Sequence, residues 1–212
     1  MNSNMFVQEI VAIIDRSGSM SGKESDTIGG INVAIQDLKD NKTIEEEINF
    51  SVKFFDDQEN VYLRRLPIEN LRPLKVSDLK PRGQTALFDA MGNSLVYFIN
   101  EKMKNPNVFN SCVIYVCTDG LENCSKKYTA ENIKNLIKTA DSYNIKLLYM
   151  GSNQDSILEA NKFGLTGSQA LNYSEITENV KCAYRSLAAA SKRHRTGEDL
   201  GFSEYERQLS QA

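Results

Sequence analysis

Apolar runs of strand length alternate along this chain with segments whose apolar residues recur at helical spacing. Residues 7–14, 111–118 and 145–150 are nearly unbroken apolar runs, which are typical of strands buried on both faces of a sheet. Leu87, Met91 and Leu95 illustrate the helical spacing between such runs. Strands that alternate with helices predict an α/β fold, in which a doubly wound, mostly parallel sheet carries helices on both faces.

Weaker patterns complete the predicted sheet. Residues 48–54 alternate apolar with polar side chains, so this strand should have one wetter face, and residues 61–66 should pair back as an antiparallel edge strand. Three prolines mark residues 67–81 as a long surface connection. After a short strand at 170–173, Ser174 is expected to cap a helix whose apolar positions are Ile176, Val180, Tyr184 and Leu187.

The bulk composition fits one globular domain. With 212 residues, of which 41% are apolar, we expect a domain at residues 1–195 and a partly ordered C-terminal extension at 196–212. No apolar run approaches the ~20 residues that span a bilayer. The N-terminal residues lack the basic and apolar regions of a signal peptide, so we expect a cytoplasmic protein. A net charge of −3 gives no reason to expect a nucleic-acid partner.

The four cysteines do not form a metal-binding or redox motif. Cys112, Cys117, Cys124 and Cys182 include no CxxC pair, so the sequence does not support a zinc ribbon or a thioredoxin-like site. We interpret them as reduced thiols. Cys112 and Cys117 belong to one strand and are an odd number of residues apart, so they should face opposite sides of the sheet.

Three loops carry oxygen-bearing side chains to the carboxyl edge of the predicted sheet. Asp15, Ser17 and Ser19 follow the first buried run, in the sequence DRSGS. Thr85 precedes the long helix, and Asp119 follows the buried run SCVIYVCT. Because ligands of such sheets bind beyond the carboxyl ends of the strands, we expect these five side chains to lie together.

The chemistry of this set predicts a divalent metal. Hard oxygen ligands suit Mg²⁺, Mn²⁺ or Ca²⁺ rather than zinc. We expect neutral hydroxyls to bind the ion directly, with one or both of Asp15 and Asp119 acting through water. Such an ion stays electrophilic and keeps an open coordination position, which the Asp or Glu carboxylate of a protein partner can fill. The pattern therefore predicts protein binding without catalysis.

At these residues the chain resembles a known family. The pattern Asp-x-Ser-x-Ser at 15–19, a lone threonine at 85 and Thr-Asp-Gly at 118–120 is similar to the von Willebrand factor type A (vWA) domain and its metal-ion-dependent adhesion site (MIDAS). The resemblance covers residues 6–195 and implies a Rossmann-like vWA fold. Relatives often have two glycines before the threonine, whereas this chain has Gly83-Gln84, and Gln84 is expected to shape which partner fits.

The resemblance also implies a role for each site residue. Ser17 and Ser19 would bind the metal directly. Thr85 would bind it directly in the ligand-engaged state and through water otherwise. Asp15 and Asp119 would hold metal-bound waters.

The family further implies a kind of partner. Its extracellular members act in adhesion, and its intracellular members serve in multiprotein assemblies, often with AAA+ ATPases or in chelatase-like machines. The sequences DRSGSM and GSNQD (residues 151–155) are similar to compact intracellular members from bacteria and their phages. We therefore expect a protein partner in an intracellular assembly, such as an AAA+ ATPase.

An enzymatic alternative starts from the same loop. An aspartate after the first strand is also the nucleophile of haloacid-dehalogenase-like phosphohydrolases, which use Mg²⁺. Their motif needs a second aspartate where this chain has Ser17, and their additional lysine and acidic pair are not evident. Metal-assisted phosphohydrolysis stays the alternative function. A phosphate-binding P-loop fails at residues 18–24 on spacing, and the only histidine, His194, is far from any nucleophile of a Ser-His-Asp triad.

Other charged residues are expected to be structural. The basic run at 192–195 is interpreted as cations that meet the negative end of a helix dipole, with a contact to nucleic acid or an acidic partner as the alternative. Asp89 is expected to support the structure rather than to contact the metal. Glu122 is expected to be a solvated loop acid.

Overall fold

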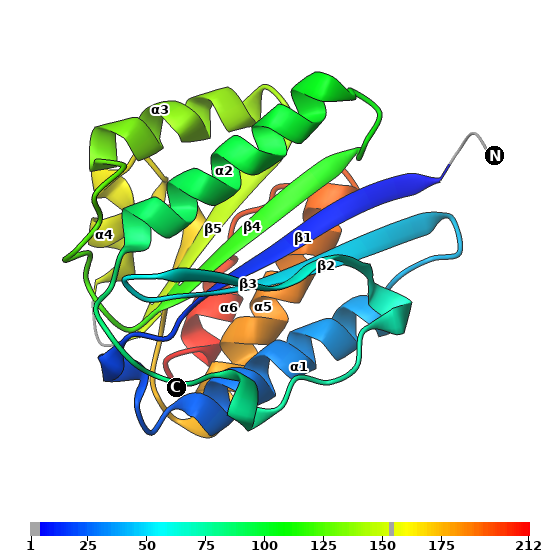
Figure 1. The fold of residues 1–212 in the computed structure, drawn as a ribbon. Coiled ribbons are helices and arrows are strands. Elements are labelled where there is room, and N and C mark those ends of the chain that lie inside the picture. Colours follow the sequence, from blue (N-terminus) through cyan, green and yellow to red (C-terminus); the bar gives the residue numbers. More distant parts are fainter. Residues whose placement is uncertain (1–4, 153–154) are drawn as a thin grey trace.

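A single six-stranded sheet, in the order β3-β2-β1-β4-β5-β6, forms the centre of the molecule (Figure 1). The computed structural model describes residues 5–152 and 155–212. Neighbouring strands are parallel except for β2 and β3, which are antiparallel, so the predicted fold class is confirmed. The strands are β1 (Phe6–Asp15), β2 (Glu46–Phe55), β3 (Glu59–Pro67), β4 (Ser111–Thr118), β5 (Ile145–Ser152) and β6 (Ala170–Tyr173).

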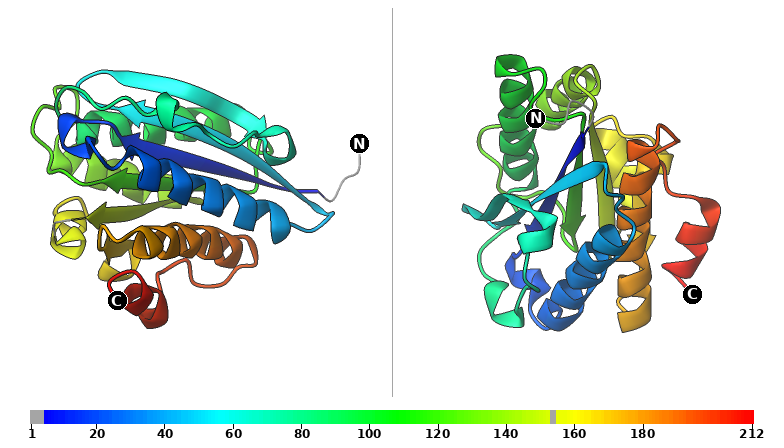
Figure 2. Two further views of the ribbon diagram at one scale, coloured as in Figure 1. Left: turned by 90° about the horizontal axis from the view of Figure 1, so that it is seen from below. Right: turned by 90° about the vertical axis from the view of Figure 1, so that its right-hand side faces the viewer.

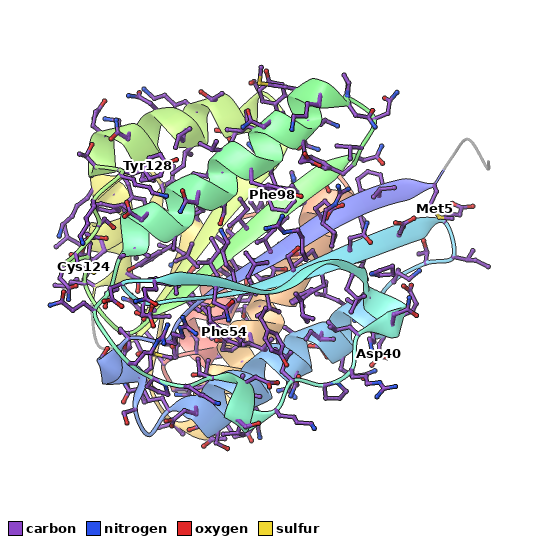
Figure 3. The ribbon with its side chains drawn as sticks, in the orientation of Figure 1. Met5, Asp40, Phe54, Phe98, Cys124 and Tyr128 are labelled. Carbon is purple, nitrogen blue, oxygen red and sulfur yellow. The ribbon has the colours of Figure 1, made fainter. Side chains whose placement is uncertain are left out.

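Helices cover both faces of this sheet (Figure 2). One face packs against α1 (Glu24–Asp40) and α5 (Thr177–Arg195). The other packs against α2 (Leu87–Lys104), α3 (Ala130–Asp141) and α4 (Ser156–Lys162). Figure 3 labels Phe54, on the α1 and α5 side, and Phe98, on α2.

The alternation of side chains along each strand produces these two layers. Ile10 and Ile14 of β1 lie in the α1 and α5 layer, whereas Val11 and Ile13 lie in the α2 layer. The cysteines of β4 divide in the same way, since Cys117 belongs to the first layer and Cys112 to the second, as predicted. A strand buried on both faces needs no polar alternation, which explains the apolar run at residues 10–14 of β1.

The predicted wetter face of β2 is only slightly more exposed than the opposite face, since Lys53 is partly exposed while Phe50 and Val52 are fully buried. Its polar residues Asn49 and Ser51 are both buried. Asn49 donates a hydrogen bond to Glu9 Oε1, and Ser51 Oγ accepts one from the backbone N–H of Arg65. Because both of these polar groups have a partner inside the fold, hydrogen bonding rather than contact with water explains the polar residues at positions 49 and 51.

The start of α5 also differs from the prediction. Ile176, not Ser174, occupies the N-cap position, and Ser174 Oγ instead accepts a hydrogen bond from Asn179 Nδ2. Ile176 is exposed, so it does not belong to the buried face of the helix, which begins at Val180.

The connection at residues 67–81 runs over the α1 side and contributes to the core. It contains two short 3₁₀ turns, Ile68–Asn70 and Val76–Asp78. Four of its side chains are buried in the layer with α1, although the prolines predicted a surface segment: Ile68, Leu71, Leu74 and Leu79. Their irregular spacing gives no helical or strand period, which is why the sequence did not reveal them.

The residues after α5 pack along the edge strand β6. Helix α6 (Glu204–Leu209) brings Arg207 to the carbonyl oxygens of Ala170 and Gly167, at 2.8 and 2.5 Å. Ser210 Oγ donates to the carbonyl of Asn172. The extension therefore covers an edge that would otherwise present unpaired backbone groups. Among the described helices, none is long and apolar enough to cross a membrane.

Candidate metal centre

Asp15 lies at the carboxyl end of β1 and is fully buried. Its Oδ1 accepts the backbone N–H of Ser17 at 2.7 Å, and its Oδ2 accepts the hydroxyl of Thr118 at 2.5 Å. Burial raises the pKa of this carboxyl above its ordinary value of 3.8, against the hydrogen bonds from Thr118 and Ser17, which lower it. A nearby cation would therefore stabilise the ionised form that the protein interior disfavours.

The two serines of the β1 loop connect Asp15 to the loop after β4. The 3₁₀ turn Gly18–Met20 folds the chain so that Ser17 Oγ and Ser19 Oγ lie 3.0 Å apart. Ser19 Oγ donates a hydrogen bond of 2.7 Å to Asp119 Oδ1. The side chain of Asp119 is only 1% exposed, so its carboxylate faces these groups and not bulk water.

Thr85 joins the same cluster from the loop before α2. It is buried, and its backbone N–H donates to Asn123 Oδ1 at 2.9 Å while its carbonyl accepts the N–H of Asn123. Gly120 shows how closely the three loops converge. A methyl group on Gly120 would lie 3.1 Å from Thr85 Oγ1, 3.6 Å from Ser19 Oγ and 3.8 Å from Asp15 Oδ2.

Backbone contacts fix the first two loops against each other. The N–H of Arg82 donates to the carbonyl of Arg16 at 2.8 Å, and the N–H of Gly18 donates to the carbonyl of Gly83 at 3.2 Å. Both arginine side chains also contact the buried carboxylate of Asp56, with Nε to Oδ2 distances of 3.0 Å for Arg16 and 2.7 Å for Arg82. The side chain of Arg16 thus binds Asp56 and stabilises the contact between the two loops.

The structure brings all five predicted site residues to one edge of the sheet, and their binding of a metal stays a prediction. The donor set fits a hard divalent ion. Two adjacent ligands of octahedral Mg²⁺, each about 2.1 Å from the metal, lie about 3.0 Å apart, which is the separation of the Ser17 and Ser19 hydroxyl oxygens. In the described part of the chain, no group of three or more His, Cys, Asp or Glu side chains could hold a metal, so an ion bound here would depend on hydroxyls.

Sequence reasoning missed two residues of the centre. Thr118, the last residue of β4, donates to Asp15. Lys23 Nζ lies 2.6 Å from Asp119 Oδ2 and also forms an ion pair with Glu175. The sequence did carry a signal for Thr118, because its hydroxyl ends a buried strand that neighbours the strand ending in Asp15. The pairing of Lys23 had no comparable signal, since it depends on the relative placement of three loops.

The neighbouring acids have structural roles. Asp89 accepts the backbone N–H groups of Lys126, Lys127 and Tyr128, so the expectation of structural support is confirmed. Glu122 is not the solvated loop acid that we expected. It accepts the backbone N–H of Phe88, in the first turn of α2, and backbone N–H groups of the loop that follows Glu122. The positive end of the helix dipole favours a carboxylate at this position.

The basic run at the end of α5 is engaged within the fold. Arg195 is buried and contacts Gln8 and Glu46. Arg193 forms a two-pronged ion pair with Glu206 of α6 at 2.9 and 3.0 Å. Specific ion pairs, rather than the helix dipole alone, therefore account for two of these cations.

Comparison with known proteins shows which fold positions this centre. No protein-family model matches the chain, and no curated protein matches its sequence. Among solved structures, a von Willebrand factor type A protein from Catenulispora acidiphila matches with a TM-score of 0.59 and 21% identity, over 89% of this chain and 43% of that one. The vWF domain of the type V pili tip protein Mfa5 from Porphyromonas gingivalis matches with a TM-score of 0.60 and 11% identity, over 91% and 95%.

A third solved structure also matches the chain. Proximal thread matrix protein 1 from the mussel byssus has a TM-score of 0.58 and 14% identity, over 88% of this chain and 46% of that one. This chain spans less than half the length of the first and third of these proteins. The molecule has the fold of vWA domains, as the resemblance of its loops implied.

Proposed function

We propose that this chain is a metal-dependent protein-binding domain. Mg²⁺, with Mn²⁺ or Ca²⁺ as substitutes, would bind among the five oxygen-bearing side chains, and its open coordination position would accept the Asp or Glu carboxylate of a partner. One observation carries the proposal: side chains from three loops converge on Gly120, with Thr85, Ser19 and Asp15 all within 3.8 Å of the position that its methyl group would take.

The chain's own residues have distinct tasks in this proposal. Ser17 and Ser19 would hold the ion, and a hydroxyl has two lone pairs besides its proton, so Ser19 can donate to Asp119 and still bind a metal. The bound ion supplies Lewis acidity toward a carboxylate. Asp15 is held by Thr118 and by the N–H of Ser17, so its position is set before any ion arrives.

The vWA fold supports this function, because solved neighbours with that fold include the tip protein of a pilus. We extend the proposal to a cytoplasmic assembly in which the partner, such as an AAA+ ATPase, presents an acidic side chain. The proposed domain is not an enzyme. Asp15 is 0% exposed and both of its oxygens accept hydrogen bonds, so no observation favours its use as the nucleophile of a phosphohydrolase.

Thermal unfolding with and without metal tests the proposal. An ion that binds only the folded state should stabilise the protein by about 2.7 kcal/mol when its free concentration is 100 times its Kd. We expect Mg²⁺ to raise the Tm relative to the protein in chelator, and no turnover of p-nitrophenyl phosphate in either condition. An unchanged Tm with Mg²⁺, Mn²⁺ and Ca²⁺ would refute the metal centre, and metal-dependent turnover would favour the phosphohydrolase.

A pair of serine variants in the same loop makes the test specific. Ser19→Ala removes a hydroxyl that contacts Ser17 and Asp119, whereas Ser21→Ala removes an exposed hydroxyl two residues further on. Ser19→Ala should lose most of the Mg²⁺-dependent rise in Tm, and Ser21→Ala should keep it. Capture of an Asp- or Glu-containing partner should be lost on chelation and in Ser19→Ala alone.

A further inference from the structure

A lysine ammonium group lies among the oxygens of the proposed metal centre. Lys23 directly precedes α1, and its Nζ is 2.6 Å from Asp119 Oδ2. The same Nζ forms an ion pair with Glu175, in the loop between β6 and α5. Burial lowers the pKa of Lys23, but hydrogen bonds to Asp119 and Glu175 outweigh burial and raise the pKa above its ordinary value of 10.5. The group therefore carries a fixed positive charge at neutral pH.

Both oxygens of Asp119 are engaged by groups of this chain. Ser19 donates to Oδ1, and Lys23 donates to Oδ2. A divalent ion in the centre would lie near this ammonium group, and like charges at such short range repel. The negative charge of Asp119 is thus already balanced by a cation that belongs to the fold.

Glu175 is a second carboxylate in contact with this cation. Glu175 contacts Lys23 from the side of β6 and accepts a hydrogen bond from Ser152 Oγ at 3.2 Å. A small cavity of about 20 Å³, lined also by Asp26 and Thr27, lies beside Lys23 and Glu175. The lysine side chain is 25% exposed, so it is less confined than the buried Asp119. Loss of the contact with Asp119 would leave Lys23 its ion pair with Glu175.

We propose that Lys23 is a resident counter-cation of Asp119, and that a divalent ion entering the centre displaces its ammonium group from Asp119 onto Glu175. This inference rests on the proposed metal-binding function and adds a residue that sets the affinity of the site. Lys23 balances the buried aspartate while the metal is absent, and it makes metal binding weaker than the oxygen ligands alone would allow.

Calorimetric titration of the whole chain with MgCl₂ tests this role. Lys23→Met keeps most of the side-chain volume and removes the charge, so it should bind Mg²⁺ at least tenfold more tightly than the wild type. Lys23→Arg keeps the charge and should stay within about threefold of the wild type. Lys42→Met is the matched control, because Lys42 is also partly buried and paired with a glutamate, Glu69, but does not contact the metal centre. It should leave the affinity unchanged.

A purely structural lysine predicts the opposite sign. If Lys23 only holds Asp119 in place, Lys23→Met should weaken Mg²⁺ binding, and that result or an unchanged Kd would overturn the inference. The ¹⁵Nζ resonance of Lys23, assigned by its loss in Lys23→Met, should shift when Mg²⁺ is added to the wild type. A resonance that stays in place at saturating Mg²⁺ would also overturn the inference.

The outcomes separate this inference from the proposed function. If the wild type binds Mg²⁺ and Lys23→Met binds it equally or less tightly, the metal centre stands and the counter-cation fails. If neither protein binds Mg²⁺ or Mn²⁺ although both are folded, the metal centre fails and the counter-cation fails with it. If only Lys23→Met binds, Lys23 occupies the native site permanently and no divalent ion displaces it, which refutes both the displacement and the metal dependence of the wild type.

Discussion

Ser19 Oγ donates a 2.7 Å hydrogen bond to Asp119 Oδ1, across one hundred residues of sequence. The contact connects the loop after β1 to the loop after β4, two strands that lie side by side in the sheet. Because the strands fix both loops, the hydroxyl and the carboxylate are oriented before any ligand arrives. Such preorganisation reduces the ordering that binding would otherwise require.

Asp15→Asn should separate the metal response from the stability of the fold. An asparagine can still accept the N–H of Ser17. Burial raises the pKa of the Asp15 carboxyl, which means that the fold disfavours its ionised form. Removing this charge should therefore leave the variant in chelator at least as stable as the wild type. The rise in Tm with Mg²⁺ should be lost. Thermal unfolding in chelator and in excess Mg²⁺ measures both effects, and an undiminished rise would remove Asp15 from the centre.

Gly120→Ala should obstruct the centre without affecting the rest of the fold. Its methyl group would come within 3.1 Å of Thr85 Oγ1, which is tighter than an ordinary contact. We expect at least a tenfold loss of Mg²⁺ affinity by calorimetry. Gly29→Ala is the matched control, since nothing lies within 4 Å of its methyl group and the change replaces a glycine within α1. It should raise stability by about 0.5–1 kcal/mol and leave the affinity unchanged.

Asp56→Asn should reveal the pH dependence of the buried carboxylate behind the rim. Burial raises the pKa of Asp56, but hydrogen bonds from Arg82 and Gln58 and the charges of the two arginines lower it further, to below its ordinary 3.8. The ionised group therefore stabilises the fold above about pH 3.8, and this contribution disappears as the pH falls through the folded-state pKa.

We expect Asp56→Asn to cost about 2 kcal/mol at pH 7, and the difference from the wild type to shrink near pH 3. Urea unfolding at the two pH values measures it. The neighbouring Asp57→Asn, at an exposed side chain, should change stability by less than about 0.5 kcal/mol. A cost for Asp56→Asn that is equal at pH 7 and pH 3 would show that its charge is not the cause.

Arg207→Ala should weaken the cover over β6. The guanidinium group donates to two backbone carbonyls, at Ala170 and Gly167, and such charged hydrogen bonds contribute about 1.5–3 kcal/mol. We expect a loss of about 2 kcal/mol in urea unfolding and more self-association by light scattering, because the edge of the sheet becomes accessible. Arg72→Ala, at an exposed position of the 67–81 connection, should change neither quantity.

Local sequence patterns were enough to predict the order of elements from β1 to α5 and the convergence of the five residues of the candidate centre, but not helix α6. The run at 7–14 has the pattern of a buried strand, and its position indicated where Asp15, Ser17 and Ser19 would lie. Contacts between distant segments could not be predicted in this way. Nothing in the sequence distinguishes Lys23 from the other surface lysines, because its partners Asp119 and Glu175 come from loops 96 residues or more away. The burial of Leu71 and Leu74 could not be predicted for the same reason, because it depends on the position of α1.

The parallel strands give the molecule a direction that is useful in the laboratory. Met5, at the start of β1, lies at the end of the sheet opposite the metal centre (Figure 3). Ser210, by contrast, accepts the N–H of Ser174, next to Glu175. A protein immobilised on a sensor surface through a tag before Met5 would therefore present its carboxyl edge to a partner in solution. A tag after Ala212 would place the surface beside that edge and could hide binding that is present.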